Sequence, residues 1–325
     1  KSNVGIPKDT IECLNQPKNG YELYKKCFSL NKCKTTMNRR TILRHTALLT
    51  AVCLAENLDA FSMTETNVRK RYPLGACDWS LQRACTPDVF EYAKKMGLDG
   101  VQLSYNSRKD ETYLLRPENQ QAMREASKRT GVKIASLAIG QLNSVPLKSE
   151  PKTVEWVSGS IDAAKALGVK VVLLAFFSNN DLRNDDAGKK VVIERLKQLA
   201  PKAEKQGIIL AIESYLSAQE HLDIIDAVGS RNVQVYYDPR NAADAGHDPY
   251  TEIPMLGKRK LICEVHLKEN DFLLGQGSID WPRIRQLLDE INFKGWAHIE
   301  GAVPKGKTVD ESYPLNVSYA KKIFG

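Results

Sequence analysis

Four acidic or imidazole side chains close four successive apolar runs in the second half of the chain, and their types suit a metal ion. They are Glu213, Asp238, His266 and Glu300, which follow the apolar runs 208–212, 233–237, 261–265 and 296–299. Three carboxylates brought together would repel one another unless a positive charge lay between them. One divalent cation is the simplest such charge. Oxygen ligands with one imidazole nitrogen favour Mn²⁺, Mg²⁺ or Co²⁺ over a metal that prefers thiolates.

The spacing of these four residues predicts how they are brought together. Successive members of the set lie 25, 28 and 34 residues apart, about the length that one strand, one helix and two loops consume in a βαβ unit. Parallel strands of a closed barrel end at one rim, where such barrels keep their chemistry. The sequence therefore predicts that all four side chains emerge at the carboxyl-end rim of a barrel.

Residues 71–325 alternate between short apolar runs and helical patterns, which predicts a single-domain α/β fold, a (β/α)8 TIM barrel. Strands are expected at 74–77, 100–103, 132–139 and 169–177, followed by the four runs above. Helices are expected at 87–96, 116–129, 152–167, 187–206, 221–228, 249–256, 281–291 and 314–323. Glycines that end a helix and lead directly into an apolar run, as in Gly168-Val169, support this alternation. The first strand is not followed by GxGxxG, which argues against a Rossmann fold.

The N-terminal 70 residues differ in composition from the rest and are left out of the fold prediction. Residues 1–36 are polar and lysine-rich, and indicate an unstructured or upstream extension. Residues 37–70 contain Arg39 and Arg40 before the modest apolar run 47–55, which resembles a twin-arginine export signal followed by a linker. This pattern predicts export to the periplasm. The alternative is a basic, disordered arm on a cytoplasmic protein.

The net charge of +8 does not predict a nucleic-acid partner. Residues 1–71 hold 13 of the 47 Lys/Arg and 6 of the 39 Asp/Glu, so the remaining 34 and 33 nearly cancel. A DNA-binding face would need a basic excess on the folded part. No run of eighteen apolar residues occurs, so a membrane span is not expected after removal of the signal. The cysteines Cys77, Cys85 and Cys263 form no CxxC pair and are interpreted as small buried hydrophobic residues.

Several motifs around the four residues resemble the sugar phosphate isomerase/epimerase superfamily, the group of xylose isomerase-like TIM barrels. The motifs are Glu213-Ser214, Tyr237-Asp238-Pro239-Arg240-Asn241, His266-Leu267-Lys268-Glu269-Asn270 and the stretch 274–281, within a likeness that covers roughly residues 72–302. The resemblance implies a metal-dependent sugar isomerase or epimerase. In that family the metal binds two oxygens of an α-hydroxy carbonyl sugar and stabilises an enediolate. It also implies that Glu213 and Glu300 are the catalytic acid–base pair as well as metal ligands, with the order of their roles left open.

Five further residues are predicted to contact a small sugar or polyol substrate. Lys268 should share the face of its strand with His266 and reach substrate oxygens. Asn241 could bind a hydroxyl group, and Trp79 with Asp78 beside it could wall the pocket at the end of the first strand. Gln276 lies in a glycine-rich loop that is expected to cover the rim. His298 is expected to lie off the face of Glu300 and to be structural.

Other functions fit the same residues. An inosose-type dehydratase would use the same enediolate, and a non-catalytic carbohydrate-binding barrel could keep an intact metal site. Apurinic endonucleases resemble this barrel but need several more histidines, whereas the folded region has only His221, His247, His266 and His298. A homo-oligomer is compatible with the sequence.

Overall fold

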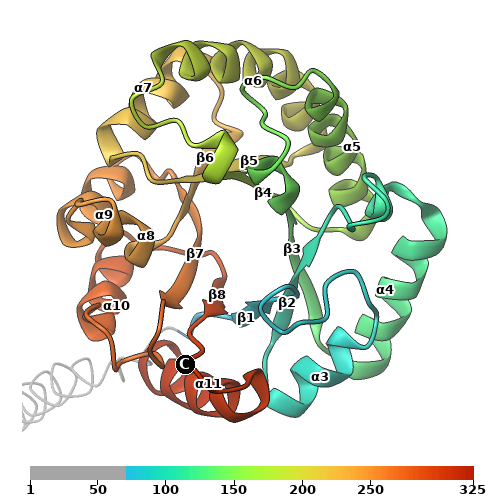
Figure 1. Cartoon of the computed structure of the whole chain (residues 1–325), viewed down its shortest axis with the longest axis vertical. Helices are drawn as coiled ribbons and strands as arrows, with labels where there is room; N and C mark the ends of the chain where they lie inside the picture. Colours follow the sequence, from blue (N-terminus) through green and yellow to red (C-terminus); the bar gives the residue numbers. More distant parts are fainter. Residues whose placement is uncertain (1–70) are drawn as a thin grey trace, which may run out of the picture. The chain divides into compact units, whose positions relative to one another are not determined.

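The computed structural model describes residues 71–325, so the expectations for residues 1–36 and 37–70, including the export signal, lie outside the described residues. Eight parallel strands close into a barrel in sequence order, with β1 pairing with β8 (Figure 1). This arrangement confirms the single TIM barrel predicted from the sequence. The strands are β1 Leu74–Cys77, β2 Gly100–Ser104, β3 Lys133–Ile139, β4 Val171–Phe176, β5 Ile209–Ser214, β6 Val233–Tyr237, β7 Ile262–Glu269 and β8 Ala297–Gly301.

Helices surround the barrel (Figure 1). They are α3 Val89–Met96, α4 Pro117–Thr130, α5 Lys152–Leu167, α6 Asp186–Gln206, α7 Ala218–Val228, α8 Pro239–Asp244, α9 Pro249–Gly257, α10 Trp281–Glu290 and α11 Val309–Phe324. Helix α5 has the predicted bounds, and Gly168 ends it with φ of 74°. Helix α11 begins at Val309 rather than at 314, because Thr308 and Glu311 form a capping box there. Within residues 71–325, no helix is long and apolar enough to cross a membrane.

Strand β7 is longer than its apolar run predicted, and this changes the place of His266. The strand continues to Glu269, so His266 lies inside it rather than at its end. The pairing of β7 with β8 sets His266 opposite His298 and Lys268 opposite Glu300. The imidazole therefore lies one side-chain layer deeper in the barrel than the carboxylate of Glu300, because interior residues alternate along each strand.

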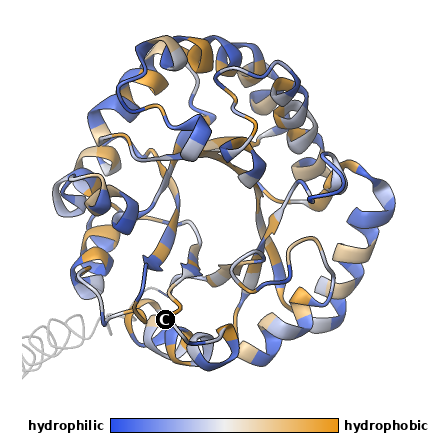
Figure 2. Ribbon diagram, viewed as in Figure 1, coloured by the Kyte–Doolittle hydropathy of each residue, from blue (hydrophilic) through white to orange (hydrophobic). Residues whose placement is uncertain are grey.

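The hydrophobic core has two parts. A large cluster between the strands and the helices includes Leu74, Val101 and Ile299, and a smaller one inside the barrel includes Leu173, Ala211 and Tyr236. Figure 2 shows hydrophobic residues along the strands and hydrophilic residues on the outer faces of the helices. Around Glu213, Asp238 and His266, on or directly after β5–β7, the barrel interior is polar instead. The fold thus leaves a polar region in an otherwise apolar barrel, where the four predicted side chains lie.

Candidate metal centre and substrate cavity

The four predicted ligands come to one place because they lie on, or directly after, the strands β5–β8. Glu213 is the penultimate residue of β5, Glu300 is the penultimate residue of β8, and His266 lies between them on β7. Asp238 follows β6 directly and caps α8, because its Oδ1 accepts hydrogen bonds from Arg240 N at 2.8 Å and Asn241 N at 3.1 Å. The other carboxylate oxygen of Asp238, Oδ2, takes no part in this cap.

The ligand atoms of these four residues all lie within 4.8 Å of one another. His266 Nδ1 is 2.8 Å from Glu213 Oε1 and 3.6 Å from Glu300 Oε2. Among the described residues no hydrogen-bond donor reaches Asp238 Oδ2, although this atom is buried. A buried carboxylate oxygen without a partner is costly, and a cation held by the four side chains would satisfy it. The donor set therefore fits a divalent metal ion.

Lys268 is the one ammonium group that approaches this cluster within the described part of the chain. Its Nζ lies 3.0 Å from Glu300 Oε2 and 3.9 Å from Asp238 Oδ2. Burial alone would lower the pKa of Lys268, but the carboxylates of Glu300 and Asp238 outweigh it and raise this pKa. The lysine is therefore a fixed positive charge that partly neutralises the carboxylates.

The same charges shift the other members of the cluster in opposite directions. Burial would lower the pKa of His266, yet the nearby Glu213 carboxylate raises it well above its usual value. Burial raises the pKa of Asp238, and Lys268 opposes that shift. For Glu300 burial is overcome by His266 and Lys268, which lower its pKa. The cluster thus has a strong electrostatic preference for positive charge at its centre.

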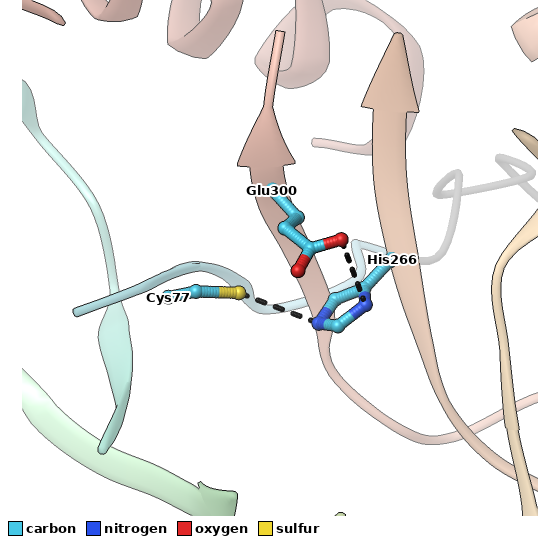
Figure 3. Close-up of side chains that lie close together, drawn as sticks. All are labelled: Cys77, His266 and Glu300. Atoms are coloured by element: carbon cyan, nitrogen blue, oxygen red, sulfur yellow. Dashed lines mark hydrogen bonds and ion pairs between the residues drawn. The ribbon is translucent and has the colours of Figure 1, made fainter. Parts of the chain in front are cut away.

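Two residues of the other half of the barrel also contact His266, and neither was predicted. The imidazole turns one nitrogen toward Glu300 and the other toward Cys77 (Figure 3). Its Nε2 is 3.3 Å from Cys77 Sγ and 3.2 Å from Gln102 Oε1. The interpretation of Cys77 as an ordinary buried hydrophobic residue missed this contact. The available signal was its position as the last residue of β1, the strand that closes the barrel beside β8.

A cavity of about 1110 Å³ opens beside the cluster. Glu213, Lys268 and Glu300 contribute to its wall. The rest of the wall comes largely from the loops after β1 to β5, including Trp79, Asn106, Arg108, Gln141, Phe177 and Tyr215. The ligand residues lie on β5–β8, whereas most of the cavity lies above β1–β5. A small molecule in this cavity could contact both glutamates.

Three of the predicted substrate-contacting residues lie beside the cluster. Trp79 lines the cavity, and its Nε1 donates a 3.0 Å hydrogen bond to Glu300 Oε1. Lys268 lines it as well. Asn241 is buried behind Glu213, and its Nδ2 donates to Glu213 Oε1 at 3.3 Å. Asn241 is therefore placed to orient Glu213, and not to contact a substrate hydroxyl as the sequence predicted.

Asp78 and Gln276 do not line the cavity, although the sequence predicted that both would contact the substrate. Asp78 is fully buried, and its carboxylate accepts hydrogen bonds from Ser104 N at 2.8 Å, Ser104 Oγ at 2.6 Å and Cys85 N at 3.2 Å. It therefore fixes the loop after β1 instead of facing the cavity. Burial raises its pKa to about 6, and the bonds from Ser104 limit that rise. Gln276 is exposed and is not among the residues that line the cavity in the described part of the chain.

His298 corrects another expectation, because it points into the barrel on the same side of β8 as Glu300. It is fully buried, and its Nδ1 is 2.8 Å from Tyr236 Oη and 3.6 Å from Glu264 Oε2. Burial raises the pKa of Glu264 to about 8, an effect that a hydrogen bond from Ser136 moderates. Residues two apart on a strand share a face, and the expectation overlooked this. These side chains form a polar layer beneath the cluster.

The other histidines of the described region do not contribute to the cluster. His221 Nε2 is 3.0 Å from Ser214 Oγ, and its Nδ1 is 2.9 Å from Ser217 O. His247 Nε2 is 3.1 Å from Tyr215 O. A site with several metal ions and several imidazole ligands, as an apurinic endonuclease would need, is therefore not assembled by these residues.

Known proteins share this fold. The chain belongs to the xylose isomerase-like TIM barrel family, whose model matches residues 90–317. It is 31% identical over 150 residues to D-psicose 3-epimerase of Enterocloster bolteae, which covers 41% of this chain and 46% of that protein. It is 24% identical over 246 residues to L-ribulose-5-phosphate 3-epimerase of Escherichia coli, which covers 70% of this chain and 86% of that protein.

A solved structure shows the same fold. The 3-keto-D-glucoside 4-epimerase from E. coli matches with a TM-score of 0.63 at 16% identity, over 78% of this chain and 100% of that one. The matched segment spans less than half of the D-psicose epimerase, 46% of its length. These three proteins are sugar epimerases.

Proposed function

We propose that the protein is a metal-dependent sugar epimerase or isomerase that removes a proton from a carbon next to a carbonyl group. The observation that carries the proposal is the placement of Glu213 and Glu300 in one cavity wall, with Asp238 and His266 beside them. These four side chains would hold one divalent ion, with Mn²⁺, Mg²⁺ or Co²⁺ suited to the donors. When bound, that ion supplies positive charge for the enediolate that forms as the substrate loses its proton.

The two glutamates differ in their surroundings, which suits a pair that exchanges a proton with the substrate. Glu300 is held at both oxygens, by Trp79 at 3.0 Å and by Lys268 at 3.0 Å. Glu213 is held at Oε1, by His266 at 2.8 Å and by Asn241 at 3.3 Å, and its Oε2 has no hydrogen-bond partner among the described residues. A carboxylate oxygen that faces a cavity can accept a proton from a bound substrate.

Two carboxyl groups, one ionised and one protonated, suffice for the proton transfers at carbon. One glutamate takes the proton as the carbon–hydrogen bond breaks, and its electron pair moves into the enediolate. The other glutamate, protonated beforehand, delivers its proton on the opposite face, which inverts the carbon. For aldose–ketose interchange the proton returns instead to the neighbouring carbon, while the hydroxyl proton moves to the oxygen on that carbon. Proton exchange with water then resets the pair. Lys268 lines the cavity, which supports a role for its ammonium group as a donor to a substrate oxygen.

A deuterium experiment tests the proposal. The full chain is incubated in D₂O with Mn²⁺ and a panel of ketoses, their phosphates and keto-inositols, and proton NMR follows the loss of each carbon-bound proton. We expect exchange at one carbon of one substrate class, and loss of that exchange in Glu213→Gln. The matched control is Glu125→Gln, which changes an exposed glutamate of α4.

The outcomes separate the candidate functions. Exchange in Glu213→Gln at the wild-type rate would exclude the assigned role. Release of water without return of a proton would identify a dehydratase. Binding of a sugar with no exchange for any compound would favour a non-catalytic carbohydrate-binding barrel.

A further inference from the structure

The imidazole of His266 is held between two different environments. Its Nδ1 faces the carboxylates, at 2.8 Å from Glu213 Oε1, and its Nε2 faces Gln102 Oε1 at 3.2 Å. A neutral imidazole carries its proton on only one nitrogen, so the group opposite each nitrogen decides which one can bind a metal. A carbonyl oxygen can only accept a hydrogen bond.

The amide of Gln102 is itself oriented by a chain of hydrogen bonds. Its Nε2 donates to Ser136 Oγ at 3.1 Å, and Ser136 Oγ donates to Glu264 Oε2 at 2.7 Å. The single hydroxyl proton of Ser136 is used on Glu264, so the hydroxyl oxygen presents a lone pair to Gln102. In this arrangement the NH₂ end of the amide faces Ser136 and its carbonyl end faces His266.

Water cannot take over this arrangement. Gln102, Ser136 and His266 are 0% exposed, and Glu264 is 2% exposed. The thiol of Cys77 also donates to Gln102 Oε1, at 3.4 Å. The carbonyl oxygen of Gln102 is thus the acceptor that faces both Cys77 Sγ and His266 Nε2. Loss of that oxygen would leave only Cys77 Sγ, a weak acceptor at 3.3 Å, opposite Nε2 of the imidazole.

We propose that Gln102, fixed by Ser136 and Glu264, is a positioning residue that keeps a proton on Nε2 of His266 and so makes Nδ1 the nitrogen that binds the metal. This inference rests on the proposed function, because it takes the cluster of Glu213, Asp238, His266 and Glu300 as the metal site. It adds a role for a residue on β2, in the half of the barrel that holds none of the four ligands.

Metal affinity is the first test. Mn²⁺ affinity of the full chain is measured by titration calorimetry for the wild type, Gln102→Met and Gln102→Glu. Methionine keeps the size of the side chain without the acceptor, and we expect about 10- to 100-fold weaker binding, the range found when a partner of a ligating histidine is removed. Glutamate keeps an acceptor oxygen, so Gln102→Glu should bind Mn²⁺ more tightly than Gln102→Met.

The matched control is Gln120→Met, which removes a buried glutamine of α4 whose Nε2 donates to Leu114 O at 2.9 Å, far from the cluster in the sequence and on another element. Its loss should lower the melting temperature without changing Mn²⁺ affinity. Equal affinities for wild type and a folded Gln102→Met would overturn the inference.

The protonation state of His266 is the second test, and it stays decisive if Gln102→Met does not fold. Nitrogen-15 NMR of the Mg²⁺-loaded wild type, labelled at histidine, should show the proton of His266 on Nε2. A proton on Nδ1 in that state would overturn the inference. Failure of the wild type to bind either Mn²⁺ or Mg²⁺ would instead remove the proposed function on which the inference rests.

Discussion

Trp79 Nε1 donates a 3.0 Å hydrogen bond to Oε1 of Glu300, and so links the loop after β1 to the carboxylate at the end of β8. This bond leaves Glu300 Oε2 directed toward Lys268 and the other ligands. Because the acceptor is a carboxylate, loss of the donor should cost about 1.5–3 kcal/mol in the orientation of Glu300.

Replacement of Trp79 by phenylalanine tests this link. We expect the turnover of Trp79→Phe to fall roughly tenfold or more, since each 1.4 kcal/mol corresponds to a factor of ten in rate. Steady-state kinetics on the substrate found by deuterium exchange provides the measurement. The control is Trp156→Phe, which changes a buried tryptophan of α5. Equal turnover for Trp79→Phe and wild type would mean that the bond does not orient Glu300 for the reaction.

Asp238→Asn should abolish tight metal binding while it leaves the fold intact. The amide oxygen of asparagine can keep the cap of α8, which uses Oδ1, but an NH₂ group then replaces the unpartnered Oδ2. Mn²⁺ affinity should fall by more than the ~10- to 100-fold loss typical of partners outside the ligand set. The control is Asp248→Asn, because Asp248 caps α9 through Tyr250 N in the same way. Similar Mn²⁺ affinities for the two variants would contradict the assignment of Asp238 as a ligand.

Lys268→Met should strengthen Mn²⁺ binding, whereas Asp238→Asn should weaken it. Without the ammonium group the carboxylates of Glu300 and Asp238 lose their nearest positive charge, so the metal-free protein should melt at a lower temperature. Mn²⁺ should then bind more tightly, and its stabilisation of the variant should exceed that of the wild type. Thermal melts with and without Mn²⁺ measure both effects. Lys148→Met, which removes a lysine paired with Asp185 at 2.9 Å, is the control, and the same metal response in all three proteins would refute the prediction.

The stability of the wild type should depend on pH through Asp78. Its pKa is raised to about 6 by burial, against 3.8 for the ordinary group, so between these values the folded state binds more protons than the unfolded state. Stability is then greatest below pH ~4 for this group and falls as pH rises toward ~6. Asparagine removes the titration while its oxygen can still accept from the two backbone N–H groups.

Urea unfolding of wild type and Asp78→Asn across pH 4–7 checks this expectation. The stability of the wild type relative to the variant should decrease with rising pH by on the order of 3 kcal/mol, since one pKa unit corresponds to about 1.4 kcal/mol. Parallel pH curves for the two proteins would show that Asp78 does not titrate in this range.

Gly75→Ala should destabilise the barrel, because Gly75 makes room for the ring of His298. A Cβ atom at Gly75 would overlap His298 Cδ2 and lie 2.8 Å from His298 Nε2. Overpacking of this kind typically costs about 1–3 kcal/mol. Gly140→Ala is the control, since a Cβ atom there meets nothing within 4 Å. A loss in the free energy of unfolding that is equal for the two variants would rule out the clash.

The comparison of sequence and structure shows which features a pattern can predict. Glu213, Asp238 and Glu300 follow apolar runs at regular spacing, and the geometry of parallel strands then places them at one rim. Cys77 and Gln102 contact His266 from positions 189 and 164 residues away in the chain. That contact depends on closure of the barrel and on ring orientation, which no local pattern contains. The inward turn of Asp78 depends on the hydrogen bonds of one loop, and a periodic pattern does not record these either.

The position of the cavity has a consequence for how this chain could change its selectivity. The groups assigned to proton transfer and metal binding come from β5–β8, and most of the cavity wall comes from loops that follow β1–β5. Trp79 in the loop after β1 holds Glu300, but substitutions in the loops after β2 and β3 can reshape what fits without moving a reacting group. Exchange of the segments around Asn106–Arg108 and Gln141 between family members is therefore a route to new sugar preferences with the same chemistry retained.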